Sequence, residues 1–152
     1  MDLRPHPRLC RYQRRIPDVS GKILLVSAAA IFDKEGRILL AQRPEGKSMA
    51  GLWEFPGGKV EEGETPAAAL ARELQEELHI KVDEASLEPL NFASFDYPDF
   101  HLLMPLFKVS DWAGTPVALE GQKLEWVRPA DLGEYPAPPA DIPLFADLAG
   151  RF

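Results

Sequence analysis

Residues 57–80 read GGKVEEGETPAAALARELQEELHI, a glycine-rich turn followed by a run that favours a helix. The hydroxyl of Thr65 is suited to cap this helix. Pro66 suits the first helical position, because the N–H that proline lacks would be unpaired there. Residues from Ala67 to Leu78 are mostly strong helix formers. The sequence therefore predicts a helix that begins directly after Thr65.

The predicted helix carries carboxylates on its last two turns. At about 100° per residue, one apolar stripe, roughly 100° wide, contains Leu70, Leu74, Leu78, Ala67 and Ala71. Measured from the first leucine of that stripe, Glu77 falls at about −20°, Glu73 at about −60° and Glu76 at about −120°. A solvated acidic face would centre all three carboxylates away from the core. Glu76 fits that description, but Glu77 lies on the edge of the stripe and Glu73 just beside it.

Two partly buried carboxylates one turn apart repel each other unless a cation or an arginine lies between them. Hard divalent cations take oxygen ligands and commonly bridge to phosphates. The positions of Glu73 and Glu77 therefore favour a site for Mg²⁺ or Mn²⁺.

The polar and glycine positions of this stretch have a fixed spacing. Five residues separate Gly58 from Glu64, and seven separate Glu64 from the run Arg72-Glu73-Leu74-Gln75-Glu76-Glu77. This pattern resembles the signature of the Nudix hydrolases, metal-dependent enzymes that cleave nucleoside diphosphates linked to another group. The signature usually has glycine where His79 stands, and that glycine ends the helix in a left-handed conformation that costs another residue on the order of 1 kcal/mol. We expect His79 to affect the helix exit and not the metal ligands.

Length and composition indicate one domain with a sizeable core, since the chain has 152 residues of which 45% are hydrophobic. The net charge of −7 argues against stable nucleic-acid binding, but a metal ion can supply positive charge locally for a nucleotide substrate. Cys10 is the only cysteine, which excludes an intramolecular disulfide and fits the reducing cytoplasm. No apolar run approaches the length of a membrane span, and the sequence indicates no oligomeric state.

Residues 1–20 differ from the rest in charge. They contain five arginines against two aspartates, and three prolines interrupt them. A basic, acid-poor leader can be an organelle-targeting segment. Because a clear amphipathic pattern is missing, we expect a flexible basic tail, or an upstream start-codon extension, followed by a Nudix hydrolase domain over residues 21–152.

Four further segments read as strands. The apolar run 22–32 and the run 37–42 flank a turn at 33–36, which predicts a hairpin with one strand central. Residues 92–97 and 101–109 read as two more strands, and Pro105 predicts that the second lies at an edge or contains a bulge. Glu54, between Trp53 and Phe55, either faces outward from a strand or turns towards the site.

Short segments complete the chain. Residues 124–127 read as a strand, 129–132 as a helical turn and 143–148 as a terminal helix. Strands and helices on one core predict an α+β fold. The resemblance implies the same, namely an αβα sandwich with a mixed sheet between helices.

Further strings resemble one subgroup, the MutT-like 8-oxo-dGTP diphosphatases that cleanse the nucleotide pool and so avoid mutation. These strings are Leu39-Leu40-Ala41-Gln42-Arg43-Pro44, Gly51-Leu52-Trp53-Glu54-Phe55-Pro56-Gly57-Gly58-Lys59, Glu120-Gly121-Gln122 and Pro138-Pro139-Ala140-Asp141. The resemblance implies that Arg72 belongs to the catalytic signature. It implies that Mg²⁺ or Mn²⁺ is held by Glu73, Glu76, Glu77, the Gly57 carbonyl and Glu120, the last as a ligand or as the base for water.

The resemblance also implies substrate contacts. Arg43 would meet the phosphates, and Asp141, where the subgroup often has asparagine, would read the base. An aspartate accepts from a purine N–H and, when protonated, also donates. Apolar positions that would surround the base are Leu24, Val26, Phe55, Tyr97 and Leu102, of which Tyr97 could stack on it. Phe100 stands where the subgroup carries a cationic residue.

The implied reaction is attack of water on the β-phosphorus, with Glu73 or Glu120 taking the proton, to give a nucleoside monophosphate and pyrophosphate. Two alternatives stay open. One is a Nudix hydrolase of another substrate, such as a cytidine triphosphate or a nucleoside diphosphate sugar. The other is a non-catalytic Nudix-fold regulator, although such modules usually lose the signature carboxylates that are present here.

Overall fold

The described part of the chain is built on two β-sheets. The computed structural model of the protein describes residues 22–152, so the predicted tail at 1–20 lies outside the described residues. One sheet has four strands in the order β4-β1-β6-β5, and the other has three in the order β3-β2-β7. No helix in the described part of the chain is long and apolar enough to cross a membrane.

The four-stranded sheet is mixed, as predicted. It contains β1 (Lys22–Ile31), β4 (Gly57–Lys59), β5 (Glu88–Asp96) and β6 (Phe100–Val109). β1 runs antiparallel to β4 and parallel to β6, while β5 and β6 are antiparallel. β1 therefore lies inside the sheet, which confirms that one strand of the first pair is central.

The three-stranded sheet is antiparallel throughout. It contains β2 (Ile38–Gln42), β3 (Trp53–Glu54) and β7 (Lys123–Val127). The predicted hairpin of β1 and β2 is therefore wrong, because the two strands belong to different sheets and share only the bridge between Phe32 and Ile38. Both strands are buried on both faces and each needs two partners. β4 and β6 occupy both edges of β1, so β2 pairs elsewhere.

Pro105 was predicted to mark an edge strand or a bulge, and the edge alternative is wrong. Its strand, β6, is interior and not an edge, with β1 on one side and β5 on the other. Pro105 lies opposite Phe92 of β5, while the parallel ladder with β1 is interrupted between the pairs Leu25–Leu103 and Ala28–Leu106. The strand tolerates the missing N–H of proline because the ladder omits this position.

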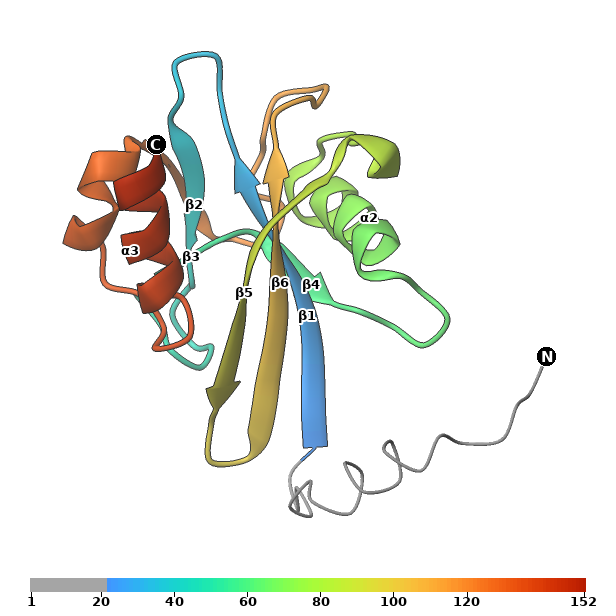
Figure 1. Cartoon of the computed structure of the whole chain (residues 1–152), viewed down its shortest axis with the longest axis vertical. Coiled ribbons are helices and arrows are strands. Elements are labelled where there is room, and N and C mark those ends of the chain that lie inside the picture. Colours follow the sequence, from blue (N-terminus) through green and yellow to red (C-terminus); the bar gives the residue numbers. More distant parts are fainter. Residues whose placement is uncertain (1–21) are drawn as a thin grey trace, which may run out of the picture.

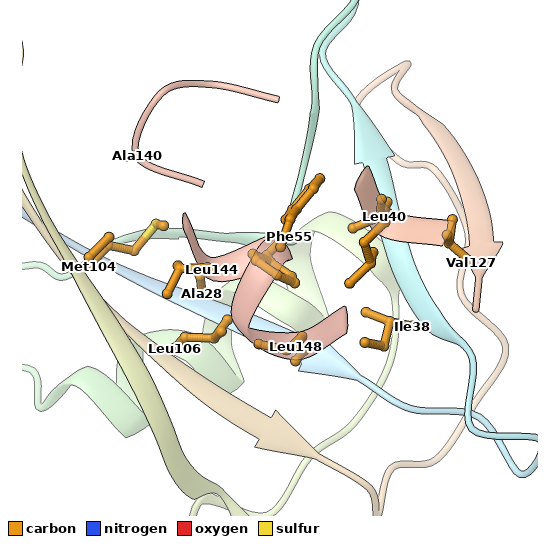
Figure 2. Close-up of a cluster of buried hydrophobic side chains, with 14 of the residues drawn as sticks. Ala28, Ile38, Leu40, Phe55, Met104, Leu106, Val127, Ala140, Leu144 and Leu148 are labelled. Carbon is orange, nitrogen blue, oxygen red and sulfur yellow. The ribbon is translucent and has the colours of Figure 1, made fainter. Parts of the chain in front are cut away.

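Helices cover both sides of the sheets, which confirms the αβα arrangement (Figure 1). The helical elements are α2 (Pro66–Leu78), the short 3₁₀ segments η1 (Glu84–Ser86) and η2 (Pro129–Glu134), and α3 (Ile142–Arg151). The leucine stripe of α2 packs on Ile31, Leu39 and Val109. Figure 2 shows Leu144 and Leu148 of α3 in the second cluster, with Leu106 of one sheet and Ile38 of the other.

Candidate active site

The helix α2 begins as its sequence predicts, and its exit, which His79 was expected to affect, keeps the left-handed form. The side-chain oxygen of Thr65 accepts the N–H of Ala68 at 3.1 Å, and Pro66 occupies the first turn. His79 follows the helix with φ 59° and ψ 34°, and its N–H donates to the carbonyl of Gln75 at 3.1 Å. The left-handed exit is therefore kept without glycine, at a cost on the order of 1 kcal/mol.

The glutamates of α2 lie where the helical spacing places them. The side chain of Glu76 is 58% exposed, whereas that of Glu73 is 19% exposed. Burial raises the pKa of Glu77 to about 8, and the charges of Glu120, Glu54 and Glu73 act in the same direction. The Oε2 atom of Glu77 is buried and has no hydrogen-bond partner among residues 22–152. A buried carboxylate oxygen without a donor is what a cation would satisfy.

Arg72 joins three segments of the signature. Its Nε donates to Glu64 at 2.8 Å, its Nη1 to Glu73 at 2.9 Å and to Glu76 at 3.2 Å. Its Nη2 donates to the backbone carbonyl of Lys59 at 3.1 Å. Hydrogen bonds from Arg72 lower the pKa of Glu64 to about 2. The arginine thus fixes the glycine-rich turn against the helix and lies between two of the predicted ligands.

Two glycines allow β4 to pass between β1 and α2. A Cβ at Gly57 would lie 2.0 Å from the carbonyl oxygen of Ser27, and a Cβ at Gly58 would lie 2.2 Å from Cδ of Glu73. Any larger residue at Gly58 would therefore displace the Glu73 carboxylate.

Glu120 comes to the same cluster from the loop before β7. The N–H of its neighbour Leu119 donates to the carbonyl of Glu77 at 3.2 Å, at the end of α2. Burial raises the pKa of Glu73, and the negative charge of Glu120 adds to that rise and to the rise at Glu77. The structure therefore places Glu120 at the end of α2 near Glu73 and Glu77, although it comes from a distant segment of the chain.

These residues suit a hard divalent cation by their chemistry. The atoms that would coordinate the ion are carboxylate oxygens. One of them, Oε2 of Glu77, is buried and has no hydrogen-bond partner in the described part of the chain, and the side chain of Glu77 lies beside the backbone of Gly57. Within residues 22–152, no three acidic, histidine or cysteine side chains converge as a formed metal cluster. Glu73 and Glu76 both hydrogen-bond to Arg72 instead. The ligand set therefore remains a prediction that the chemistry of the donors supports.

A cavity of about 420 Å³ adjoins the glycine-rich turn. All the predicted base and phosphate contacts line it: Leu24, Val26, Arg43, Phe55, Tyr97, Phe100, Leu102 and Asp141. The ring of Tyr97 already packs against Phe95 and Phe100, with centroids 4.8 and 5.3 Å away. Larger hollows lie beside the turn at 33–36 and beside residues 81–85, and none contains a predicted site residue.

Asp141 is 5% exposed in the wall of this cavity. Burial raises its pKa to about 7, and the charge of Glu54 acts in the same direction. A backbone hydrogen bond with Phe55 and the charge of Arg43 oppose the rise. Asp141 is therefore able to present either an acid or a carboxylate near neutral pH.

Arg43 and Glu54 show where sequence reasoning was incomplete. Glu54 turns towards the cavity, which settles the alternative left open by its position between two aromatic residues. Arg43 donates to Glu54 at 3.1 Å and to the carbonyl of Ser48 at 2.6 Å, so its guanidinium holds the cavity wall together. The alternation Trp53-Glu54-Phe55 left both orientations of the carboxylate open, because only the fold shows which face of the strand meets the cavity.

Comparison with known proteins gives consistent matches. The NUDIX domain family model matches residues 27–147. An 8-oxo-dGTP diphosphatase from Proteus vulgaris is 46% identical over 91 residues, which are 60% of this chain and 80% of that protein. A CTP pyrophosphohydrolase from Escherichia coli K12 is 43% identical over 126 residues, which are 76% of this chain and 84% of that protein. A solved structure from a study of MutT of Aliivibrio salmonicida and Vibrio cholerae has a TM-score of 0.74 at 36% identity, covering 86% of this chain and all of that one.

Proposed function

Because this chain belongs to the Nudix hydrolase family, as a MutT-like pyrophosphohydrolase of nucleotides, we propose that its substrate is 8-oxo-dGTP. The products would be 8-oxo-dGMP and pyrophosphate, and the role would be sanitation of the cytoplasmic nucleotide pool. The observation that carries this assignment is the buried Asp141 in a cavity that adjoins the glycine-rich turn, which packs on Glu73. An ionised Asp141 accepts from two N–H groups of an oxidised guanine at once.

Mg²⁺ or Mn²⁺ would be held by Glu73, Glu76, Glu77, Glu120 and the carbonyl of Gly57. When bound, such an ion offsets the phosphate charges and lowers the pKa of a coordinated water. The chain's own residues do the rest. The cavity wall orients the base, Lys59 and Arg43 at that wall face the phosphates, and Glu73 or Glu120 takes the proton of the attacking water.

The raised pKa of Glu77 fits this arrangement. A buried carboxylate oxygen without a donor binds either a proton or a cation, so a cation competes with protons for Oε2 of Glu77. The side chains of Glu73 and Glu76 each accept a hydrogen bond from Arg72. Metal binding by this cluster would therefore release protons and strengthen with rising pH.

A cytidine triphosphate is the second candidate substrate, and two observations favour it. A CTP pyrophosphohydrolase is among the relatives at more than 40% identity. A protonated Asp141 donates to the ring N3 of cytosine and accepts from its amino group, and its pKa of about 7 makes that form accessible. The two substrates therefore call for opposite protonation states of one side chain.

Product formation by the purified protein with Mg²⁺ distinguishes these candidates. It is followed by chromatography of all products, because cleavage of ADP-ribose gives AMP and ribose 5-phosphate and no pyrophosphate. We would compare kcat/KM for 8-oxo-dGTP, dGTP, dCTP, CTP and ADP-ribose at pH 6.5 and pH 8. A large preference for 8-oxo-dGTP supports the proposal. A preference for CTP would replace it with the second candidate, and preference for ADP-ribose would reject both. Nucleotide binding without any turnover would contradict hydrolysis itself.

A further inference from the structure

Gln122 has a buried side chain, 8% exposed, just after Glu120 in the loop before β7. Its Oε1 accepts the backbone N–H of Glu120 at 2.8 Å. Its Nε2 donates to the backbone carbonyl of Glu77 at 3.3 Å. A side-chain amide both accepts and donates while uncharged, so this single residue joins the loop that carries Glu120 to the helix that carries Glu77.

The loop meets α2 at the end of the helix, where carbonyl groups lack partners inside the helix. Leu119 donates its N–H to the carbonyl of Glu77 at 3.2 Å, and Val117 donates to that of Leu78 at 2.9 Å. These backbone contacts fix the loop only as far as Leu119. The N–H of the next residue, Glu120, is held by the side chain of Gln122.

Local backbone geometry makes this contact possible. Gly121 has φ +75°, a left-handed conformation that lets the chain turn back between Glu120 and Gln122. The amide of Gln122 thereby reaches the N–H two residues earlier.

The carboxylate of Glu120 has no hydrogen bond or ion pair of its own within residues 22–152, and its side chain is exposed. The hydrogen bond between its neighbour Leu119 and the carbonyl of Glu77 places Glu120 at the end of α2. There its negative charge adds to the burial that raises the pKa of Glu77. With nothing holding the carboxylate directly, its place depends on the backbone of the loop. That backbone depends on Gln122.

We propose that Gln122 is a positioning residue, whose buried amide fixes Glu120 beside Glu77 and thereby sets the affinity of the site for a divalent cation. The inference rests on the proposed function, because it takes Glu77 and Glu120 to act in metal-dependent hydrolysis. Methionine at position 122 would keep the length of the side chain but lose both hydrogen bonds.

A titration with Mn²⁺ tests the role of Gln122 without any substrate. The electron paramagnetic resonance signal of the free ion measures how much Mn²⁺ is bound. We expect Gln122→Met and Glu120→Gln each to weaken Mn²⁺ binding by roughly tenfold. The double variant should bind no more weakly than Glu120→Gln alone, because Gln122 acts through Glu120. Asn91→Ala is the control. It removes a side-chain amide that donates to Asp147 of α3 at 2.8 Å and that does not contact the glutamates of α2. This variant should bind Mn²⁺ like the wild type.

A folded Gln122→Met variant with wild-type Mn²⁺ affinity would overturn the inference, as would a double variant in which the two losses multiply. If Gln122→Met does not fold, hydrogen exchange in the wild-type protein tests whether Gln122 holds the backbone of Glu120. The amide of Glu120 should be protected, and exchange as fast as in an unstructured chain would overturn the inference. If the variants show the expected Mn²⁺ affinities but the wild type does not hydrolyse 8-oxo-dGTP, the positioning role of Gln122 is supported and the proposed substrate is rejected. Failure of the wild type to bind Mn²⁺ would overturn both.

Discussion

Arg43 and Glu54 form an ion pair of 3.1 Å in the wall of the cavity that also contains Asp141. The two partners act on Asp141 in opposite directions, since the charge of Glu54 raises its pKa and that of Arg43 lowers it. Burial of Asp141 raises its pKa more than either charge changes it. The cavity therefore holds an aspartate that titrates near neutral pH, beside a pair whose charges offset each other.

Replacing Asp141 with asparagine should change how stability depends on pH. Folded Asp141 keeps its proton to about pH 7, whereas the unfolded chain releases it near the ordinary value of 3.8. The protonated side chain therefore contributes its full stabilisation below pH 3.8, and this stabilisation is lost as the pH rises through 7. Between pH 5 and pH 8 the free energy of unfolding should fall less in Asp141→Asn, by about 3 kcal/mol at most, because this range crosses about two pH units below the folded pKa. Urea unfolding in EDTA measures this, and Asp99→Asn, on the surface, should behave like the wild type.

Gly58→Ala should impair the site without unfolding the protein. The added Cβ would lie 2.2 Å from Cδ of Glu73, at the far end of a flexible side chain that is able to move aside. We expect kcat/KM to fall by roughly 10- to 100-fold, with little change in melting temperature. Gly133→Ala is the matched control, because nothing lies within 4 Å of a Cβ placed there. Unchanged turnover in Gly58→Ala would contradict a role for the Glu73 carboxylate in its observed position.

His79→Gly should stabilise the protein, because residue 79 has φ 59° and only glycine adopts that conformation without cost. The gain should be up to about 1 kcal/mol, since part is offset by the greater freedom of glycine in the unfolded chain. His79→Ala keeps the strained conformation and should not gain stability. Denaturant unfolding compares the two, and equal stabilities would show that the exit geometry is not strained.

Hydrolysis in H₂¹⁸O should place the label in pyrophosphate. In attack on the β-phosphorus, the water oxygen bonds to that phosphorus and the bridging oxygen leaves with the nucleoside monophosphate. Mass spectrometry of the two products measures where the label lies. Label in the monophosphate would show attack on the α-phosphorus instead.

Sequence reasoning succeeded where the determining interactions are local. The period of the α-helix alone distinguished the exposed Glu76 from the partly buried Glu73. The cap at Thr65 depends on neighbours within three residues. These features follow from chain geometry, so a single sequence suffices to predict them.

The failures concern the choice of distant partners. β1 and β2 looked like a hairpin because their turn is local, but β4 and β6 already fill both edges of β1. The edge alternative for Pro105 was wrong because the gap in the ladder with β1, which tolerates the proline, is invisible in the sequence. The proximity of Glu54 to Asp141 likewise joins segments nearly ninety positions apart. Glu120 was placed at the site only through the family resemblance.

Glu77→Gln tests the central claim, that the carboxylates of α2 form a catalytic cation site. Turnover with Mg²⁺ should fall at least about 100-fold, because glutamine is the same size but cannot supply a negatively charged ligand. The metal-free variant should at the same time be more stable than the wild type above pH 8, since it no longer buries an unpartnered carboxylate. Measuring pyrophosphate release and thermal unfolding in EDTA on one preparation gives both results. Wild-type turnover by a folded Glu77→Gln protein would contradict the account.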